Sequence, residues 1–172
     1  MSGAKTKPQD LRRRRRTSKH GCWGHLTVAP LWVAYDANLG TLMRTCDAVG
    51  ACLAVPATAH YRNALSVGDT LKSRRPRIHW VAPSKQAWLD VQREQGKRLV
   101  AVELADGATP LPRLQPARTA TVLLLGHEHN GVPDEVLAMV DECVEIPMTG
   151  WGASLNVAVA GSLVLYRLAG LS

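Results

Sequence analysis

The sequence has no apolar run long enough to cross a membrane. Its most apolar segment, Val157 to Leu168, is too short to span a bilayer and contains Ser162 and Arg167. Residues 17–25 are polar and interrupted by glycine, so the hydrophobic core of a secretory signal peptide is also missing. We therefore expect a soluble cytoplasmic protein with no membrane partner.

Patterns typical of metal, disulfide and dinucleotide sites are also missing. The four cysteines, Cys22, Cys46, Cys52 and Cys143, form no C-x-x-C pair, and their apolar surroundings predict reduced core residues. His20, Cys22 and His25 lack a partner pair at zinc-site spacing, so we expect no metal. No G-x-G-x-x-G follows the first predicted strand, which argues against a dinucleotide-dependent oxidoreductase.

Acidic residues are nearly missing from the first twenty positions, which carry all the excess positive charge. This segment has eight Lys or Arg and one Asp, whereas the remainder has thirteen Lys or Arg and thirteen Asp or Glu. Its five consecutive arginines are Arg12, Arg13, Arg14, Arg15 and Arg16. Guanidinium groups bind phosphate oxygens bidentately, so we expect residues 1–24 to form a flexible basic arm that binds nucleic acid. A solvated leader without a partner is the alternative.

One further basic cluster lies in the body of the chain. It consists of Lys72, Arg74, Arg75 and Arg77, interrupted only by Ser73 and Pro76. These side chains either extend the phosphate-binding surface of the arm or form a solvated turn. We favour contact with nucleic acid.

Short apolar runs alternate with segments of helical periodicity from residue 25 onward. Strands are predicted at Val28–Tyr35, Ala51–Val55, Ile78–Val81, Leu99–Leu104, Val122–Leu125 and Val144–Ile146. A helix is predicted from the spacing of Leu39, Leu42, Met43 and Cys46, with Asp36 or Asn38 as its cap. Further helices are predicted from Ser84 to Gly96, from Pro133 to Met139 and from Leu155 to Leu168. The order predicts one α/β domain, residues 25–172, with a mostly parallel sheet and helices on both faces.

Three turns that follow predicted strands are rich in glycine and polar residues. They are the segments 36–44, 126–131 and 146–160. Ligands of open parallel sheets bind beyond the carboxyl ends of the strands, so we expect these turns to converge on one crevice. In the third turn, Ser154 and Asn156 open an apolar helix, beside exposed backbone amides.

These turns resemble the three motifs of the SpoU (TrmH-like) branch of the SPOUT RNA methyltransferases. Asn38, Gly40 and Arg44 match N-x-G-x-x-x-R, and Gly126, Glu128 and Gly131 match G-x-E-x-x-G. The segment from Ile146 to Val157 matches I-P-M-x-G followed by S-L-N-V. Each short motif alone recurs by chance, but all three occur in family order, and the resemblance runs from about Trp32 to Leu168.

The resemblance implies a deep C-terminal trefoil knot, from about residue 121 to 170. It also implies S-adenosylmethionine as cofactor, S-adenosylhomocysteine as product, no metal, and methyl transfer to a ribose 2′-hydroxyl of RNA. The implied cofactor contacts are Glu103, Leu104, Leu125, Gly126, Ile146, Met148, Ser154 and Leu155. Apolar side chains can hold an adenine while glycine backbone approaches the ligand closely.

The implied catalytic residues are Arg44, Asn38, Glu128, Ser154 and Asn156. Each also has a structural interpretation: Asn38 and Ser154 as helix caps, Asn156 as a first-turn residue, Glu128 as a loop acid, and Arg44 as a helix residue with its charge in solvent. We expect Glu128 to hydrogen-bond Asn38 or loop amides. His127 and His129 are left outside the site.

Arg44 is the family's candidate for removing the proton of the 2′-hydroxyl. An arginine keeps its own proton at ordinary pH and is a poor base. Either an RNA phosphate takes part in the transfer, or Arg44 grips the phosphate and stabilises negative charge while water removes the proton. The residues leave both possibilities open.

The segment Arg44–Gly50 resembles the subgroup that modifies guanosine 18 of tRNA, so we favour tRNA, with rRNA as the other substrate class. The family also implies a homodimer through the knot and the apolar closing helix. A non-catalytic RNA-binding or ribosome-associated protein with the same fold is the rival hypothesis. The intact set of motif residues argues against it.

Overall fold

The computed structural model describes residues 25–66 and 76–172. The arm predicted at residues 1–24, with Arg12 to Arg16, lies outside the described residues, as do Lys72, Arg74 and Arg75 of the basic cluster. Arg77 is described. Among the described residues, no helix is long and apolar enough to span a membrane.

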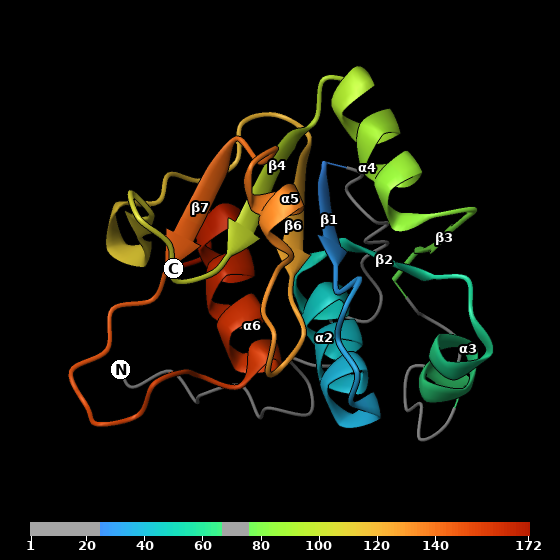
Figure 1. Cartoon of the computed structure of the whole chain (residues 1–172), viewed down its shortest axis with the longest axis horizontal. Helices are drawn as coiled ribbons and strands as arrows, with labels where there is room; N and C mark the ends of the chain where they lie inside the picture. The colour runs from blue at the N-terminus through green and yellow to red at the C-terminus, as the bar shows by residue number, and fades with distance from the viewer. Residues whose placement is uncertain (1–24, 67–75) are drawn as a thin grey trace, which may run out of the picture.

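One parallel sheet organises the described chain (Figure 1). Its strands lie in the order β3-β2-β1-β6-β4-β7-β5, and every paired neighbour runs parallel. Their bounds are β1 Leu26–Ala29, β2 Cys52–Pro56, β3 Ile78–Val81, β4 Arg98–Val102, β5 Thr109–Pro110, β6 Thr121–Leu125 and β7 Glu142–Glu145. The carboxyl ends of these strands therefore share one edge of the sheet.

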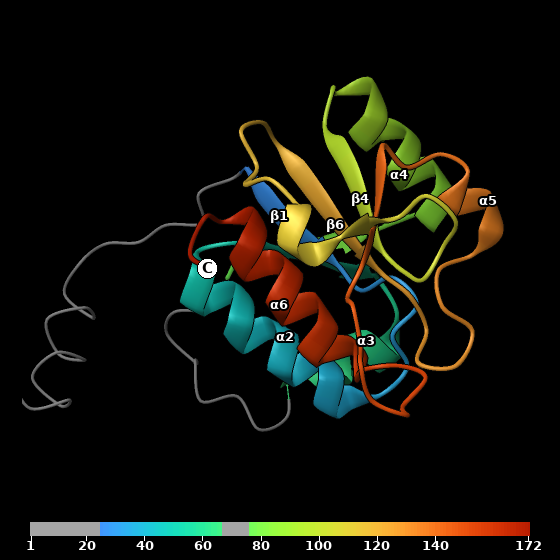
Figure 2. The ribbon, with the colours of Figure 1, turned by 90° about the vertical axis from the view of Figure 1, so that its left-hand side faces the viewer.

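Helices cover both faces of the sheet, as the sequence predicts. Helices α2 (Asp36–Val49), α3 (Ala59–Ser66) and α6 (Val157–Leu168) pack on one face, and α4 (Lys85–Glu94) and α5 (Asp134–Leu137) on the other. Figure 2 shows α2 and α6 side by side, with the strands between them and α4. A 3-10 helix, η1, spans Leu111–Arg113.

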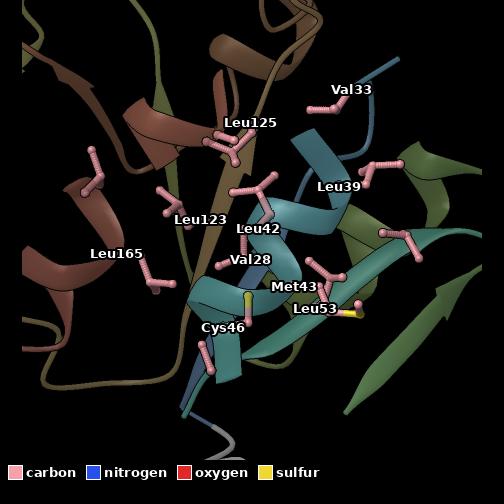
Figure 3. Close-up of a cluster of buried hydrophobic side chains, with 14 of the residues drawn as sticks. Val28, Val33, Leu39, Leu42, Met43, Cys46, Leu53, Leu123, Leu125 and Leu165 are labelled. Atoms are coloured by element: carbon pink, nitrogen blue, oxygen red, sulfur yellow. The ribbon is translucent and has the colours of Figure 1, made fainter. Parts of the chain in front are cut away.

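The larger core cluster lies between the sheet and the helix pair α2 and α6. Leu42 and Cys46 on α2 lie near strand residues such as Val28 and Leu123 (Figure 3), and Leu39 belongs to the same cluster. Each fully buried aliphatic side chain stabilises the fold by about 1.5–3 kcal/mol. Because Gly161 has no Cβ, α6 lies close to β6; a Cβ there would meet Leu125 Cδ1 at 2.6 Å.

The first predicted strand is wrong beyond Ala29. β1 ends there, and residues 30–35 form a loop that begins at Pro30, which has no N–H to donate to a neighbouring strand. Leu31 and Val33 are buried even so, because the Tyr61 hydroxyl donates to Val33 O at 2.7 Å and holds the loop inward. The alternation of apolar residues at 31 and 33, which predicts a strand, comes instead from a loop with two buried side chains.

Helix caps agree with the sequence in part. Ser84 caps α4 as predicted, since its hydroxyl oxygen accepts the Ala87 amide at 3.1 Å. Neither Asp36 nor Asn38 caps α2; the N-cap is Tyr35, which makes no side-chain cap bond. The cap of α6 is Asn156 and not Ser154, because the Asn156 Oδ1 accepts the amides of the first turn.

Two elements and one thiol differ from the sequence predictions. The sequence analysis missed α3 and the two-residue strand β5, which lie in segments without a clear apolar period. Cys46 and Cys143 are free, whereas Cys52 is disulfide-bonded, so the prediction of four reduced cysteines is wrong for Cys52.

Candidate active site at the carboxyl edge of the sheet

A chain of hydrogen bonds joins the three motifs at the carboxyl edge. Asn38 Nδ2 donates to Glu128 Oε1 at 2.7 Å, and Asn156 Nδ2 donates to Asn38 Oδ1 at 2.9 Å. Asn38 is 7% exposed, so both ends of its amide are used in a nearly water-free position. Residues 118 positions apart in the sequence are thereby locked together. The expected convergence of the motifs is confirmed for these three side chains.

Glu128 also binds the loop that follows β1. Its carboxylate accepts the Ala34 amide at 3.0 Å and the Tyr35 amide at 3.1 Å, in addition to Asn38. Burial by itself would raise the pKa of Glu128, but these hydrogen bonds outweigh it and hold the pKa below its ordinary value. Glu128 is therefore an anionic anchor, and the prediction that it bonds both Asn38 and loop amides is confirmed.

The loop that carries Glu128 is closed tightly on itself. His127 and Gly131 exchange two backbone hydrogen bonds, each 2.9 Å long. Gly126 lies against this closure, where a Cβ would be 2.2 Å from the carbonyl carbon of Gly131. Gly131 adopts φ +67°, and Glu103 reaches the same turn by accepting the Val132 amide at 3.0 Å. The loop 126–131 is thus held by hydrogen bonds and close contacts within the chain itself.

Asn156 connects this rigid region to α6. Its Oδ1 accepts the amides of Ala158 at 2.9 Å and Val159 at 3.2 Å, which satisfies the first turn of the helix. Its Nδ2 remains free to bind Asn38. One side chain therefore performs the cap role and the role of joining two motifs.

The residues predicted to contact the cofactor lie at the same edge but differ in exposure. Sheet register places Val102 opposite both Leu125 and Val144, so Glu103, Gly126 and Glu145 follow on adjacent strands. Leu125 itself is buried in the core, and only its backbone can face a ligand. The other predicted apolar contacts are partly or well exposed: Ile146, Met148 (43%), Leu155 (40%) and Leu104 (76%).

Ser154 and Arg44 lie apart from the hydrogen-bonded chain. Ser154 is exposed in the loop before α6. Arg44 is exposed on α2, six residues after Asn38. By helix geometry it is about 9 Å farther along the axis, with its side chain about 120° away around the helix. The hydrogen-bonded chain therefore contains three of the five predicted catalytic side chains, Asn38, Glu128 and Asn156.

Arg77 lies just before β3, at the amino edge of the sheet, and is exposed. It is thus at the opposite edge from Glu128. Within the described ranges no group of three His, Cys, Asp or Glu residues is placed to hold a metal ion.

A cleft beside Glu128 was missed by the sequence analysis. It has a volume of about 690 Å³ and lies between the loop after β1 and the loop after β6. Its lining is Trp32, Val33, Ala34, His60, Tyr61, Lys85, His127, Asn130, Gly131 and Pro133. The sequence predicts a strand as far as Tyr35, and Trp32, Val33 and Ala34 of the cleft lie in that segment. Pro30 is the residue that could have shown that a loop begins after Ala29.

Comparison with known proteins agrees with these motifs. The model of the SpoU rRNA Methylase family matches residues 26–166, which is most of the chain. The chain belongs to the SpoU rRNA methylase family. The resemblance stated from the motifs is thereby confirmed, and the SpoU family also accounts for the parallel α/β architecture.

Several members of the SpoU family are similar to this chain. A tRNA (guanosine(18)-2′-O)-methyltransferase of Escherichia coli is 30% identical over 154 residues, which cover 83% of this chain and 62% of that protein. The chain thus spans less than two thirds of that relative. The structure of the A. aeolicus TrmH/SpoU tRNA modifying enzyme has a TM-score of 0.71 and 25% identity, covering 95% of this chain and 82% of that one. The structure of an AdoMet-bound rRNA methyltransferase from Sinorhizobium meliloti has a TM-score of 0.71 and 27% identity, and the match covers 87% of this chain and 57% of that one.

Proposed function

We propose that this SpoU family member transfers the methyl group of S-adenosylmethionine to a ribose 2′-hydroxyl of RNA, with tRNA favoured over rRNA. The observation that carries the proposal is the hydrogen-bonded chain from Glu128 through Asn38 to Asn156, which unites all three motifs at the ligand-binding edge. The similar proteins are named for methylation or modification of tRNA and rRNA, and one was solved with the cofactor bound.

The cofactor would bind beyond the adjacent strands β4, β6 and β7. Glu103 and Leu104, Leu125 and Gly126, Ile146 and Met148, and Ser154 and Leu155 would hold it. The residues fit such a ligand: Gly126 leaves backbone open to close approach, and the exposed side chains of Leu104, Met148 and Leu155 can cover an adenine. S-adenosylmethionine supplies an activated methyl group there and becomes S-adenosylhomocysteine.

Catalysis would rest chiefly on positioning of the ribose. Displacement at a methyl carbon releases a neutral thioether, so alignment of the 2′-hydroxyl supplies much of the rate. Glu128 and Asn38 hold Asn156 and the start of α6 in place, and Ser154 and Asn156 face the cofactor and the ribose. Because Arg44 keeps its proton, its role in this proposal is to bind phosphate and stabilise the negative charge that develops on the ribose oxygen.

Replacement of Arg44 by alanine tests this role. The variant should lose methyl transfer while S-adenosylmethionine binds with unchanged affinity in calorimetry. Retained transfer would remove Arg44 from the catalytic set.

A homodimer through α6 is part of the proposal. Val159, Leu163 and Tyr166 form an exposed apolar stripe, 48%, 44% and 37% exposed. Together with Thr41 and η1 they border a groove of about 650 Å³. Apolar side chains at helical spacing on a surface favour a partner, and a second copy seated here would lie beside Arg44 on α2. Leu163→Lys should yield monomers in sedimentation; an unchanged dimer would place the interface elsewhere.

The domain boundaries and the knot complete the proposal. Residues 25–172 would form the methyltransferase domain, with the trefoil knot from about 121 to 170 and the basic arm at 1–24. The match of the family model to residues 26–166 supports this division, and α6 returns to pack against β6 through Gly161. A cytoplasmic location agrees with an RNA substrate.

The arm and Arg77 would add phosphate contacts. Deletion of residues 1–20 should weaken RNA affinity and flatten its salt dependence, because each lost phosphate contact removes released counterions. An unchanged slope of affinity against salt concentration would exclude the arm from RNA binding.

The decisive experiment supplies the protein with S-adenosylmethionine labelled in the methyl group and with bulk tRNA or rRNA. Ribose methylation makes the adjoining phosphodiester resistant to alkali and ribonuclease, so the modified nucleotide can be mapped. The proposal expects label on a ribose of tRNA. A wild-type protein that binds no cofactor and labels no RNA would contradict it.

A further inference from the structure

The cleft beside Glu128 lies between β1 and β6, where the order of the strands in the sheet reverses. From β1 the chain passes to α2 on one face, whereas from the neighbouring strand β6 it passes to α5 on the other. The two connecting loops therefore diverge and leave a crevice, the usual place for a ligand in a parallel sheet. The volume of about 690 Å³ falls in the range of small-ligand sites.

The cleft is separate from the proposed cofactor site but shares a wall with the catalytic chain. None of the eight residues proposed to hold the cofactor lines it. Ala34 lines the cleft and gives its amide to Glu128 at 3.0 Å, and His127 and Asn130 flank Glu128 in the closed loop. A molecule in the cleft therefore lies next to the proposed active site.

The cleft walls combine aromatic rings with a cation. Trp32, His60, Tyr61 and His127 supply the rings, and within residues 25–66 and 76–172 no carboxylate lines the cleft. Lys85 Nζ lies 5.4 Å from the centre of the Trp32 ring, which places an ammonium group over the indole. Burial lowers the pKa of Lys85 because it disfavours the charged ammonium group. A phosphate beside this group would favour the charged form.

The cleft also has directional hydrogen-bonding groups on its walls. The His129 amide donates to His127 Nδ1 at 3.0 Å, so Nδ1 is an acceptor in this loop. Asn130 offers an amide donor and an acceptor. Tyr61 is tied to Val33 O, and burial, followed by the charge of Glu128, raises its pKa to about 12, so it stays a neutral donor that fixes the cleft floor.

We propose that this cleft binds one unstacked nucleotide of the RNA substrate, with its base against the aromatic rings and its phosphate at Lys85. Stacking on aromatic side chains and hydrogen bonds to base edges are the means by which proteins hold bases removed from their stack. The proposal rests on the RNA substrate proposed above. It adds a second, residue-specific contact that places the target ribose beside the catalytic chain.

Matched variants of the full chain test the cleft. Trp32→Leu keeps apolar bulk but removes the ring, and RNA should bind about tenfold or more weakly, the loss typical of one stacked base. Trp32→Phe should restore most of that affinity. Lys85→Gln should weaken RNA binding several-fold more than Lys97→Gln, a control with the same charge change just before β4 at the opposite edge. Affinity for S-adenosylmethionine should be unchanged in all four.

Cross-linking provides a second readout that does not depend on the stability of the variants. RNA carrying 4-thiouridine, irradiated with the wild-type protein, should attach to peptides that contain residues 30–35 or 127–133. Cross-links confined to other regions would overturn the proposal, as would a Trp32→Leu variant that is folded and binds RNA like the wild type. Weakened cofactor binding with unchanged RNA affinity would assign the cleft to the cofactor and also overturn it.

The two proposals fail in different ways. If the wild type methylates RNA but the cleft variants retain full RNA affinity, only the cleft proposal fails. If the wild type binds RNA through the cleft and transfers no methyl group, the enzymatic function fails while the cleft stands.

Discussion

Two loops at the carboxyl edge of the same sheet are built in opposite ways. The loop 126–131 is closed by two backbone hydrogen bonds, contacted by Glu103, and tied through Glu128 to the loop after β1. The loop from Pro147 to Leu155 is exposed along its length, with Trp151 fully in solvent. No hydrogen bond attaches it to the rest of the described chain. Yet both carry family motifs.

The loop 126–131 forms a half of the proposed site that is in place before ligands bind. The loop from Pro147 to Leu155 forms a half that ligands complete. Preorganised groups need no rearrangement at the moment of reaction, which suits the side chains that align the ribose. A loop with few contacts opens at low cost and is stabilised by whatever binds it, such as the cofactor or a second copy of the chain. We therefore expect substitutions in the first loop to affect folding, and those in the second to affect binding.

Gly126→Ala should produce the largest loss of stability. The added Cβ would lie 2.2 Å from backbone of Gly131, which cannot move without opening the closed loop. We expect about 3 kcal/mol lower free energy of unfolding in urea, near the upper end for overpacking.

Gly152→Ala is the matched control in the open loop. A Cβ at Gly152 meets nothing within 4 Å, so its unfolding free energy should stay within about 0.5 kcal/mol of the wild type. Equal losses in the two variants would remove the distinction between the loops.

Glu128→Gln should produce the next largest loss of stability. Three donors converge on the two carboxylate oxygens, and the amide nitrogen of glutamine cannot accept any of them. We expect about 1–2 kcal/mol lower stability, together with loss of methyl transfer. A variant with normal stability and normal activity would show that the anchor has neither role.

Acid should erase the stability difference between the wild type and Glu128→Gln. The pKa of Glu128 is lowered in the folded protein, so the unfolded state binds the proton more strongly, and the stabilisation exists above the ordinary pKa of 4.5. It is lost as pH falls through the lower folded pKa. Urea unfolding of both proteins at pH 7 and pH 3 should show a smaller gap in unfolding free energy at pH 3; a larger gap at pH 3 would reverse the assignment.

Ser154→Ala should give the smallest effect on stability. Ser154 is exposed and does not cap α6, so its removal should change the unfolding free energy by less than about 0.5 kcal/mol. Calorimetry should nevertheless show weaker cofactor binding, whereas Thr149→Ala in the same loop should bind normally. Identical affinities would place Ser154 outside the site.

Local sequence patterns predicted the parts of the fold that depend on local physics. Apolar periodicity gave most strands and helices, and the capping role of Ser84 follows from its own side chain. The contact of Glu128 with Asn38 is predicted because Glu128 lies between two glycines after a buried strand, where its carboxylate can bond Asn38 or loop amides. The sequence thus predicts the bond from Asn38 to Glu128 but not the bond from Asn156 to Asn38.

Features that depend on tertiary packing were not predictable in this way. The loop 30–35 has the alternation of a strand because Leu31 and Val33 are buried by Tyr61, which lies on a helix that the sequence did not reveal. The bond from Asn156 to Asn38 joins residues 118 positions apart, and no local pattern reports such a distance. The cleft at Trp32 follows from the first of these arrangements, because Val33 and Tyr61 both line it.

Hydrogen exchange of the two loops, with and without S-adenosylmethionine, tests the division of the site most directly. Amides in the loop 126–131 should exchange slowly in both states, because their hydrogen bonds exist before the cofactor binds. Amides between Gly150 and Leu155 should exchange rapidly alone and become protected when the cofactor is added. Unchanged exchange in the second loop, or protection gained only in the first, would contradict the account.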